Sequence, residues 1–150
     1  MNATPAVDRR IEASPDRVFE VLADGWLYAI WVVGASRMRA VEDVWPAEGA
    51  RLHHSAGVWP ALIDDETTLL TWEPSSRVVL EAKGWPLGTA RVELTVQSDG
   101  PNASRVSIAE DVHRGPARVL PKPLRQAMMV ARNTETLRRL AFVVEGRASL

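Results

Sequence analysis

The sequence predicts an α+β fold in which an antiparallel β-sheet packs against one long C-terminal helix. Three observations support this fold class. A short helix with start and stop signals follows the first strand, alternating apolar and polar residues fill the middle of the chain, and an apolar helical stripe runs through its C-terminal region. The 150 residues show no repeats, low-complexity tracts or linkers, so we expect a single domain, 1–150.

The first strand is expected at Val7–Ile11, where apolar and polar residues alternate weakly. A helix should follow, because the Ser14 hydroxyl can cap the free N–H groups of its first turn and Pro15 suits the first helical position. Gly25 is expected to end this helix in the left-handed conformation. The apolar residues that would share its buried face are Val18, Phe19 and Leu22.

The middle of the chain alternates between strands and turns. Residues 26–33 are apolar almost throughout and end at Gly34, which predicts a second short helix or a buried turn. In the next segment, Met38 and Ala40 should face the side opposite Arg37 and Arg39. Asp99-Gly100-Pro101-Asn102 predicts the turn of an antiparallel hairpin. The expected strands are Ser36–Glu42, Ala50–Ala56, Leu62–Trp72, Arg77–Lys83, Thr89–Gln97 and Ser104–His113.

The last element is a helix that should begin at about Pro121 or Pro123 and end near Glu145, with Gly146 as its stop. Its main apolar stripe is Val130, Leu137, Leu140, Ala141 and Val144, joined at its start by Leu124, Ala127 and Ala131. Its outer, solvated face is Arg132, Glu135, Arg138 and Arg139.

The composition excludes several classes of protein. A net charge of −1 gives no general attraction to nucleic acid or to an anionic membrane. The absence of cysteine removes disulfides, thiolate metal sites and a cysteine nucleophile. No apolar run of about 20 residues could span a bilayer, and the N-terminus lacks the apolar core of a signal peptide. We therefore expect a cytoplasmic protein that neither inserts into membranes nor binds nucleic acid.

Tryptophan is unusually frequent, with six residues against two Phe and one Tyr. They are Trp26, Trp31, Trp45, Trp59, Trp72 and Trp85. Each side chain either fills the core or lines a cavity for a ring-shaped or amphipathic ligand, and the sequence leaves both interpretations open.

Several segments together resemble one known family. They are Ile11-Glu12-Ala13-Ser14-Pro15 with residues 18–24, Trp31, Gly49-Ala50-Arg51-Leu52, Trp72-Glu73-Pro74 with Arg77 and Val79-Leu80, and residues 133–140. On these residues the chain resembles the START-related SRPBCC superfamily, and within it the bacterial polyketide cyclase/dehydrase-like members. The resemblance extends over nearly the whole chain, and its motifs are structural rather than catalytic.

The resemblance implies a helix-grip fold, in which a curved seven-stranded antiparallel sheet grips the long C-terminal helix and two short helices follow the first strand. It also implies an elongated apolar cavity between sheet and helix that binds lipids, sterols or polyketides. Small inward residues (Ala82, Ala90, Ala127, Ala131 and Ala141) favour a pocket of a few hundred Å³. The residues we expect to bind the ligand are Tyr28, Trp31, His54, Trp72, Leu94, Ile108, Glu110, Val130, Asn133 and Leu137.

Two polar residues are candidates for acid–base chemistry in such a cavity. Glu110 shares a strand face with Val106 and Ile108, and an interior carboxyl would have a raised pKa unless an arginine holds it ionised. His54 shares a face with Leu52, whereas His53 points the other way, so the two cannot form one metal site. For each candidate the alternative is a structural role, as a polar group that water, an arginine or the core satisfies.

Other polar groups carry weaker signals. Asn133 lies on the helix stripe and Tyr28 lies in an apolar segment, so each needs a partner in the protein or on a ligand. His113 and Asp111 supply two metal ligands without a third, and we expect no metal and no cofactor. The acidic run Asp64-Asp65-Glu66 is expected at a solvated strand edge or turn, because it lacks the spacing of a calcium loop.

Three functions are consistent with these patterns. The first is the binding of a small hydrophobic molecule, with the protein as a monomer or homodimer. The second is a cyclase or dehydratase in which Glu110 or His54 moves protons. The third is a regulatory module that binds a partner at its outer surface. The motifs of serine hydrolases, P-loop proteins, zinc metalloproteases and dinucleotide-binding folds are absent from the sequence.

Overall fold

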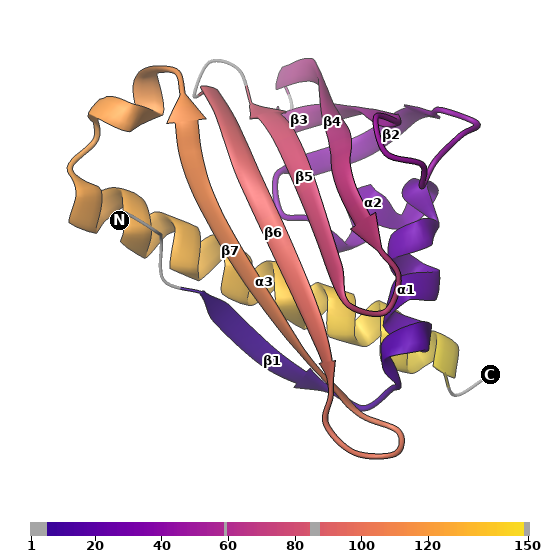
Figure 1. Cartoon of the computed structure of the whole chain (residues 1–150). Helices are drawn as coiled ribbons and strands as arrows, with labels where there is room; N and C mark the ends of the chain where they lie inside the picture. The colour runs from indigo at the N-terminus through magenta and orange to yellow at the C-terminus, as the bar shows by residue number, and fades with distance from the viewer. Residues whose placement is uncertain (1–5, 59, 85–87, 149–150) are drawn as a thin grey trace.

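The computed structural model describes residues 6–58, 60–84 and 88–148. In this part of the chain seven strands form one sheet, and a long helix crosses its inner face (Figure 1). The strands are β1 (Val7–Ile11), β2 (Ala35–Val41), β3 (Arg51–Val58), β4 (Ala61–Glu73), β5 (Arg77–Gly84), β6 (Gly88–Ser98) and β7 (Ser104–Arg114). The helices are α1 (Pro15–Ala23), α2 (Tyr28–Trp31) and α3 (Lys122–Ala148), with two short 3₁₀ helices, η1 (Gly25–Leu27) and η2 (Pro116–Val119).

The sheet order is β1-β7-β6-β5-β4-β3-β2, and all neighbours are antiparallel. Strands β2 to β7 therefore pair in chain order, and β1 joins the far edge by pairing with β7. The sheet curves around α3, which contacts β1, β7, α1 and α2 (Figure 1). This is the helix-grip fold, and the predicted α+β class with its curved seven-stranded sheet is confirmed.

The predicted strands agree with the observed ones to within two residues at each end. Strand β2 departs from the predicted alternation. Its partly buried residues are Ala35, Met38 and Val41, three residues apart, and Ala40 is exposed. The pairing with β3 shifts register twice along β2, and each extra residue turns the following side chains to the other face. The prediction that Ala40 shares a face with Met38 is therefore wrong.

Helix α1 begins as predicted, although its cap is made differently. Ser14 has the extended backbone of a cap residue, but its hydroxyl makes no capping hydrogen bond. Its carbonyl oxygen instead accepts the N–H groups of Arg17 and Val18, at 3.0 and 3.2 Å. The helix start therefore depends on backbone bonds and on Pro15, not on the predicted serine hydroxyl.

Gly25 is required for a reason the sequence did not reveal. Helix α1 ends at Ala23, and Gly25 is not among the residues with a left-handed backbone in the described chain. A Cβ atom at Gly25 would lie 2.6 Å from Leu52 Cδ2 and 2.8 Å from Val41 Cγ1. Glycine is thus needed because η1 packs closely on β2 and β3, and the predicted left-handed stop is wrong.

Helix α3 begins at Lys122, as expected, but continues through Gly146 to Ala148, so the predicted stop is wrong. Leu124, Ala127 and Ala131 are exposed, contrary to prediction. At about 100° per residue they lie about 120–180° around the helix from Asn133, which faces the sheet. The buried residues of α3 are Asn133, Thr136, Leu137, Leu140, Ala141 and Val144.

The core divides along α3 into two parts. The closed half is the region where Leu137, Leu140, Ala141 and Val144 pack with β1, α1 and the larger side chains of β6 and β7. The open half is the region of a small second cluster formed by Ala90, Val112, Leu120 and Met129. No helix in the described chain is long and apolar enough to cross a membrane.

The tryptophans serve different purposes. Trp31 is buried, and Trp45 and Trp72 are partly buried against the same core. Trp26 is 57% exposed and borders an open hollow at the surface together with Trp45, away from the interior. Trp59 and Trp85 lie outside the described residues.

Candidate functional site

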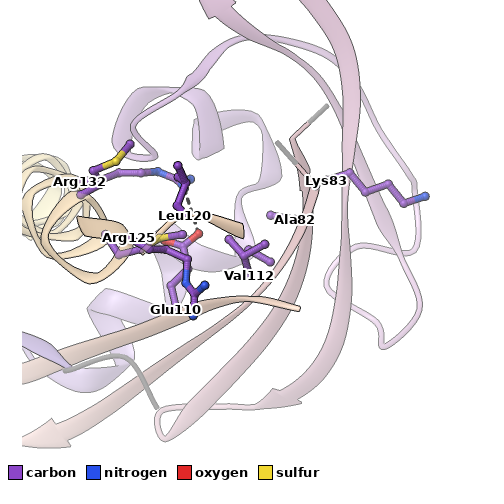
Figure 2. Close-up of a pocket in the computed structure, with 11 residues that line it drawn as sticks. Ala82, Lys83, Glu110, Val112, Leu120, Arg125 and Arg132 are labelled. Carbon is purple, nitrogen blue, oxygen red and sulfur yellow. Dashed lines mark hydrogen bonds and ion pairs between the residues drawn. The ribbon is translucent and has the colours of Figure 1, made fainter. Parts of the chain in front are cut away.

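Three spaces that share lining residues lie between the inner face of the sheet and the helices. We call them the outer cavity (about 150 Å³), the inner chamber (about 20 Å³) and the side cavity (about 470 Å³). The outer cavity lies in the open half, between β5–β7, η2 and α3 (Figure 2). The side cavity lies between α2 and the β2–β5 part of the sheet. The expected volume of a few hundred Å³ is thus found in the side cavity, while the space against α3 is smaller.

Small side chains on the sheet create the outer cavity. Ala82 on β5 and Ala90 on β6 are opposite each other in the strand pairing, and both line the cavity. Apolar Val112, Leu120 and Met129 complete most of the wall. Ala127 and Ala131, which were also expected to line a pocket, face solvent.

Glu110 and Arg132 form an ion pair where the spaces meet. Alternation along β7 turns Glu110 inward with Ile108, as predicted, and leaves the residue 2% exposed. Arg132 on α3 donates from Nη1 to Glu110 Oε2 at 2.9 Å (Figure 2). Its Nε also donates to the Val33 carbonyl at 3.0 Å. Arg132 lines all three spaces and Glu110 lines two of them.

The environment of Glu110 has opposing effects on its acidity. Burial raises the pKa of the Glu110 carboxyl above its ordinary value, and the Arg132 charge offsets part of that rise. Asn133 also lies near enough to lower the pKa, although no hydrogen bond of good geometry joins the two side chains. The result is a buried carboxyl with one oxygen paired and Oε1 unpaired among the residues described.

A second polar group lies beside the side cavity. The Thr67 hydroxyl bonds both Tyr28 OH, at 3.0 Å, and His54 Nε2, at 2.9 Å, and all three residues are buried. Burial lowers the pKa of His54, so its ring is neutral near pH 7, and burial raises the pKa of Tyr28. Tyr28 lines the inner chamber as well, so this chain of hydrogen bonds reaches the same interior as Glu110.

The acidic run is not at a sheet edge, contrary to prediction. Strand β4 lies between β3 and β5, and alternation buries Asp65 while Asp64 is exposed. Glu66 pairs with Lys83 at 2.8 Å, and this lysine points away from the outer cavity (Figure 2). His53 lies on the outer face, as expected, within 3.9 Å of Glu66.

Seven of the ten predicted ligand-binding residues line these spaces. They are Tyr28, Trp31, His54, Leu94, Ile108, Glu110 and Asn133. The other three do not. Trp72 packs edge-to-face on Phe19, with ring centres 5.1 Å apart, and Leu137 belongs to the closed core. Val130 is half-buried and lines none of the three spaces.

Three site residues escaped sequence reasoning, although each of them carried a signal. Arg132 and Thr136 lie three residues after Met129 and Asn133, respectively. Residues at this spacing share one face of a helix, and here that face is turned to the sheet. Assigning Arg132 to the solvated outer face is therefore wrong. Thr67 lies two residues from Leu69 on β4, so alternation could have shown that it faces the core.

Comparison with known proteins identifies the family. The model of the family described as "Polyketide cyclase / dehydrase and lipid transport" matches residues 4–145. The chain belongs to this family. Among curated proteins, none matches the chain at a significant level.

Solved structures of bacterial proteins share the fold across nearly the whole chain. A protein from Nitrosomonas europaea is 13% identical, with a TM-score of 0.71 and coverage of 97% of this chain and 96% of that one. The Zhui aromatase/cyclase from Streptomyces sp. R1128 is 17% identical, with a TM-score of 0.67 and coverage of 97% and 92%. A START superfamily protein from Mycobacterium smegmatis is 15% identical, with a TM-score of 0.66 and coverage of 97% and 96%. At these identities the likeness concerns the fold alone.

The part of the chain that the structure describes contains no group of three or more His, Asp or Glu side chains arranged to hold a metal ion. His113 lies 3.5 Å from Glu81 as an ion pair across the sheet. What the interior offers is an apolar space bordered by the ion pair between the buried Glu110 carboxyl and the partly exposed Arg132 guanidinium.

Proposed function

We propose that the protein binds a small, largely apolar molecule in the outer cavity, with its polar end at the Glu110–Arg132 pair. The observation that carries this proposal is the position of the pair, at the inner end of an apolar space of about 150 Å³. Apolar walls supply affinity through burial, and a few fixed polar groups supply orientation. Family membership supports the same class of ligand.

Filling the cavity tests this function. Ala82→Phe places a ring in a wall shared by the outer and side cavities. Ala127→Phe makes the same change on the exposed face of α3 and serves as the matched control. Native mass spectrometry and solvent extraction of the purified protein would identify molecules that co-purify. We expect Ala82→Phe to lose them and Ala127→Phe to retain them. Equal retention by both variants would contradict binding in the cavity.

A second function is favoured by one specific feature. Glu110 has a raised pKa and an unpaired oxygen next to the cavity, as expected of a group that exchanges protons with a bound substrate. The reaction class would be the cyclisation or dehydration of a ligand with an acidic carbon, with Glu110 as the base and Arg132 stabilising the developing negative charge.

Proton exchange distinguishes catalysis from binding. A β-ketoacyl thioester in D₂O would exchange its α-protons faster with the wild-type protein than with Glu110→Gln, as followed by NMR. His54→Gln separates the two predicted acid–base candidates, because only the residue that touches the substrate should change the rate. Equal exchange rates with and without the protein would leave binding as the function.

A further inference from the structure

Three buried polar atoms, on side chains that line the inner chamber, have no hydrogen bond of good geometry to any residue that the structure describes. They are Trp31 Nε1, Asn133 Nδ2 and Glu110 Oε1. Their side chains line the chamber and are 3%, 2% and 2% exposed, respectively. Nearly all buried polar groups in proteins are paired, so three unpaired atoms around one small space indicate that the space accepts a polar group.

The volume limits what that group can be. A space of about 20 Å³ holds one non-hydrogen atom with its hydrogens, about the size of a water molecule. Leu80, Val92 and Leu94 form an apolar wall around it. The chamber is therefore an end pocket for one polar atom, and the body of a ligand must lie elsewhere.

The donors and acceptors specify the chemistry of that atom. The indole of Trp31 and the amide of Asn133 donate, whereas Glu110 Oε1 accepts because Arg132 holds the other carboxylate oxygen. A hydroxyl group matches this set, since its oxygen accepts two hydrogen bonds and its hydrogen donates one. A carbonyl or ether oxygen would leave Glu110 Oε1 unpaired. A carboxylate would place a second negative charge beside Glu110.

We propose that the inner chamber binds the hydroxyl group of an apolar alcohol or phenol whose body lies in the outer cavity. This inference rests on the proposed binding function. Glu110 and Arg132 line both spaces, so a ring in the outer cavity has its substituent directed toward the chamber at this pair. Trp31 and Asn133 then donate to the hydroxyl oxygen, and the hydroxyl donates to Glu110 Oε1.

Two probes of nearly equal shape test the proposal. These are 2-naphthol, which carries the hydroxyl, and 2-methylnaphthalene, which replaces it by a methyl group. Titrations followed by amide NMR shifts would give both dissociation constants. The wild-type protein should bind 2-naphthol at least about tenfold more tightly, because the methyl group leaves the three polar atoms unpaired. The indole N–H resonance of Trp31 should move with 2-naphthol and not with 2-methylnaphthalene.

Three variants test which residues cause the preference for 2-naphthol over 2-methylnaphthalene. Asn133→Leu and Trp31→Phe each remove one donor and should each reduce the preference to about threefold or less. Ala127→Leu changes the exposed face of α3, outside all three spaces, and should keep the preference of the wild-type protein. Because the measured quantity is a ratio of two affinities, a general loss of packing cancels. If one of the first two variants fails to fold, the other still decides.

The outcomes separate this proposal from the function on which it rests. If both probes bind with equal affinity, the cavity binds apolar molecules and the hydroxyl proposal is wrong. If neither probe binds, the binding function itself is overturned for ligands of this size. A preference that survives in both Asn133→Leu and Trp31→Phe would also overturn the proposal, because the hydroxyl would then bind elsewhere.

Discussion

The two halves of α3 face the same sheet, yet only one of them packs closely against it. In the closed half, Leu137, Leu140 and Val144 are at most 1% exposed and contact the apolar side chains of β1 and α1. In the open half, the corresponding face carries Met129 and Arg132, which line the cavity. One helix thus joins a region that stabilises the fold to a region that can admit a ligand.

Side-chain size along the strands accounts for the difference. On the inner face of β6, residue size increases from Ala90 in the open half to Leu94, which lies at the border of the inner chamber and the core. Strand β5 follows the same gradient from Ala82 to Leu80. In the open half, the short side chains of Ala82 and Ala90 do not fill the space between the sheet and α3. A cavity therefore forms without any break in the strand pairing.

The largest expected effect tests the closed half. Leu140→Ala should lower the free energy of unfolding by about 2–5 kcal/mol, because a fully buried leucine is replaced by a void that closely packed neighbours cannot fill. Met129→Ala, on the same helix in the open half, should cost only about 1 kcal/mol, since its side chain already faces a cavity. Urea denaturation measures both. Equal losses would show that the two halves contribute alike to stability.

The second-largest expected effect concerns the buried hydrogen bonds of Thr67 beside the side cavity. Thr67→Val keeps the shape of the side chain but leaves Tyr28 OH and His54 Nε2 without their shared partner. We expect a loss of about 1–3 kcal/mol in the free energy of unfolding. Thr68→Val, on the opposite face of β4, is the control and should change stability by no more than about 0.5 kcal/mol. A neutral Thr67→Val would mean that water satisfies both groups.

A pH-dependent effect should separate Glu110 from the rest of the interior. A carboxyl whose pKa is raised on folding binds more protons in the folded state, so its contribution to stability becomes less favourable as pH rises. The loss begins near the ordinary pKa of 4.5 and is complete above the raised value in the folded protein. Glu110→Gln removes this loss, so the stability of the variant relative to the wild-type protein should improve as pH rises above 4.5.

The size of that change follows the pKa shift, at about 1.4 kcal/mol for each unit. Urea titrations at several pH values measure it. Arg132→Met provides a second measurement, because removing the guanidinium raises the pKa of Glu110 further and extends the loss to higher pH. A difference between Glu110→Gln and the wild-type protein that does not change with pH would contradict the raised pKa.

Strand alternation made much of this interior predictable. The inward position of Glu110 follows from its spacing with Ile108, and the same period of two indicates the strands other than β2, which departs from it. The pairing of Glu110 with Arg132 was not predictable, because it joins residues on different elements whose distance depends on the curvature of the sheet. The sequence did not indicate which face of the first turns of α3 is turned to the sheet, because apolar residues there lie on both faces. The close approach of two elements, as at Gly25 against Leu52 and Val41, leaves no pattern in the local sequence.

The smallest expected effect lies on the outer face of the closed half and shows whether burial or position along α3 determines stability. Phe142 is 65% exposed, and its one described ring contact is with Arg138, whose guanidinium carbon lies 5.1 Å from the ring centre. Removing such an exposed cation–π contact costs about 0.5–1 kcal/mol, while alanine favours the helix by a few tenths of a kcal/mol. Phe142→Ala should therefore lower the free energy of unfolding by at most about 0.5 kcal/mol, against the far larger loss for Leu140→Ala two residues away. A loss as large as that of Leu140→Ala, or one that depends on protein concentration, would mean that a second copy of the chain covers this face, because only a buried phenylalanine is so costly to remove.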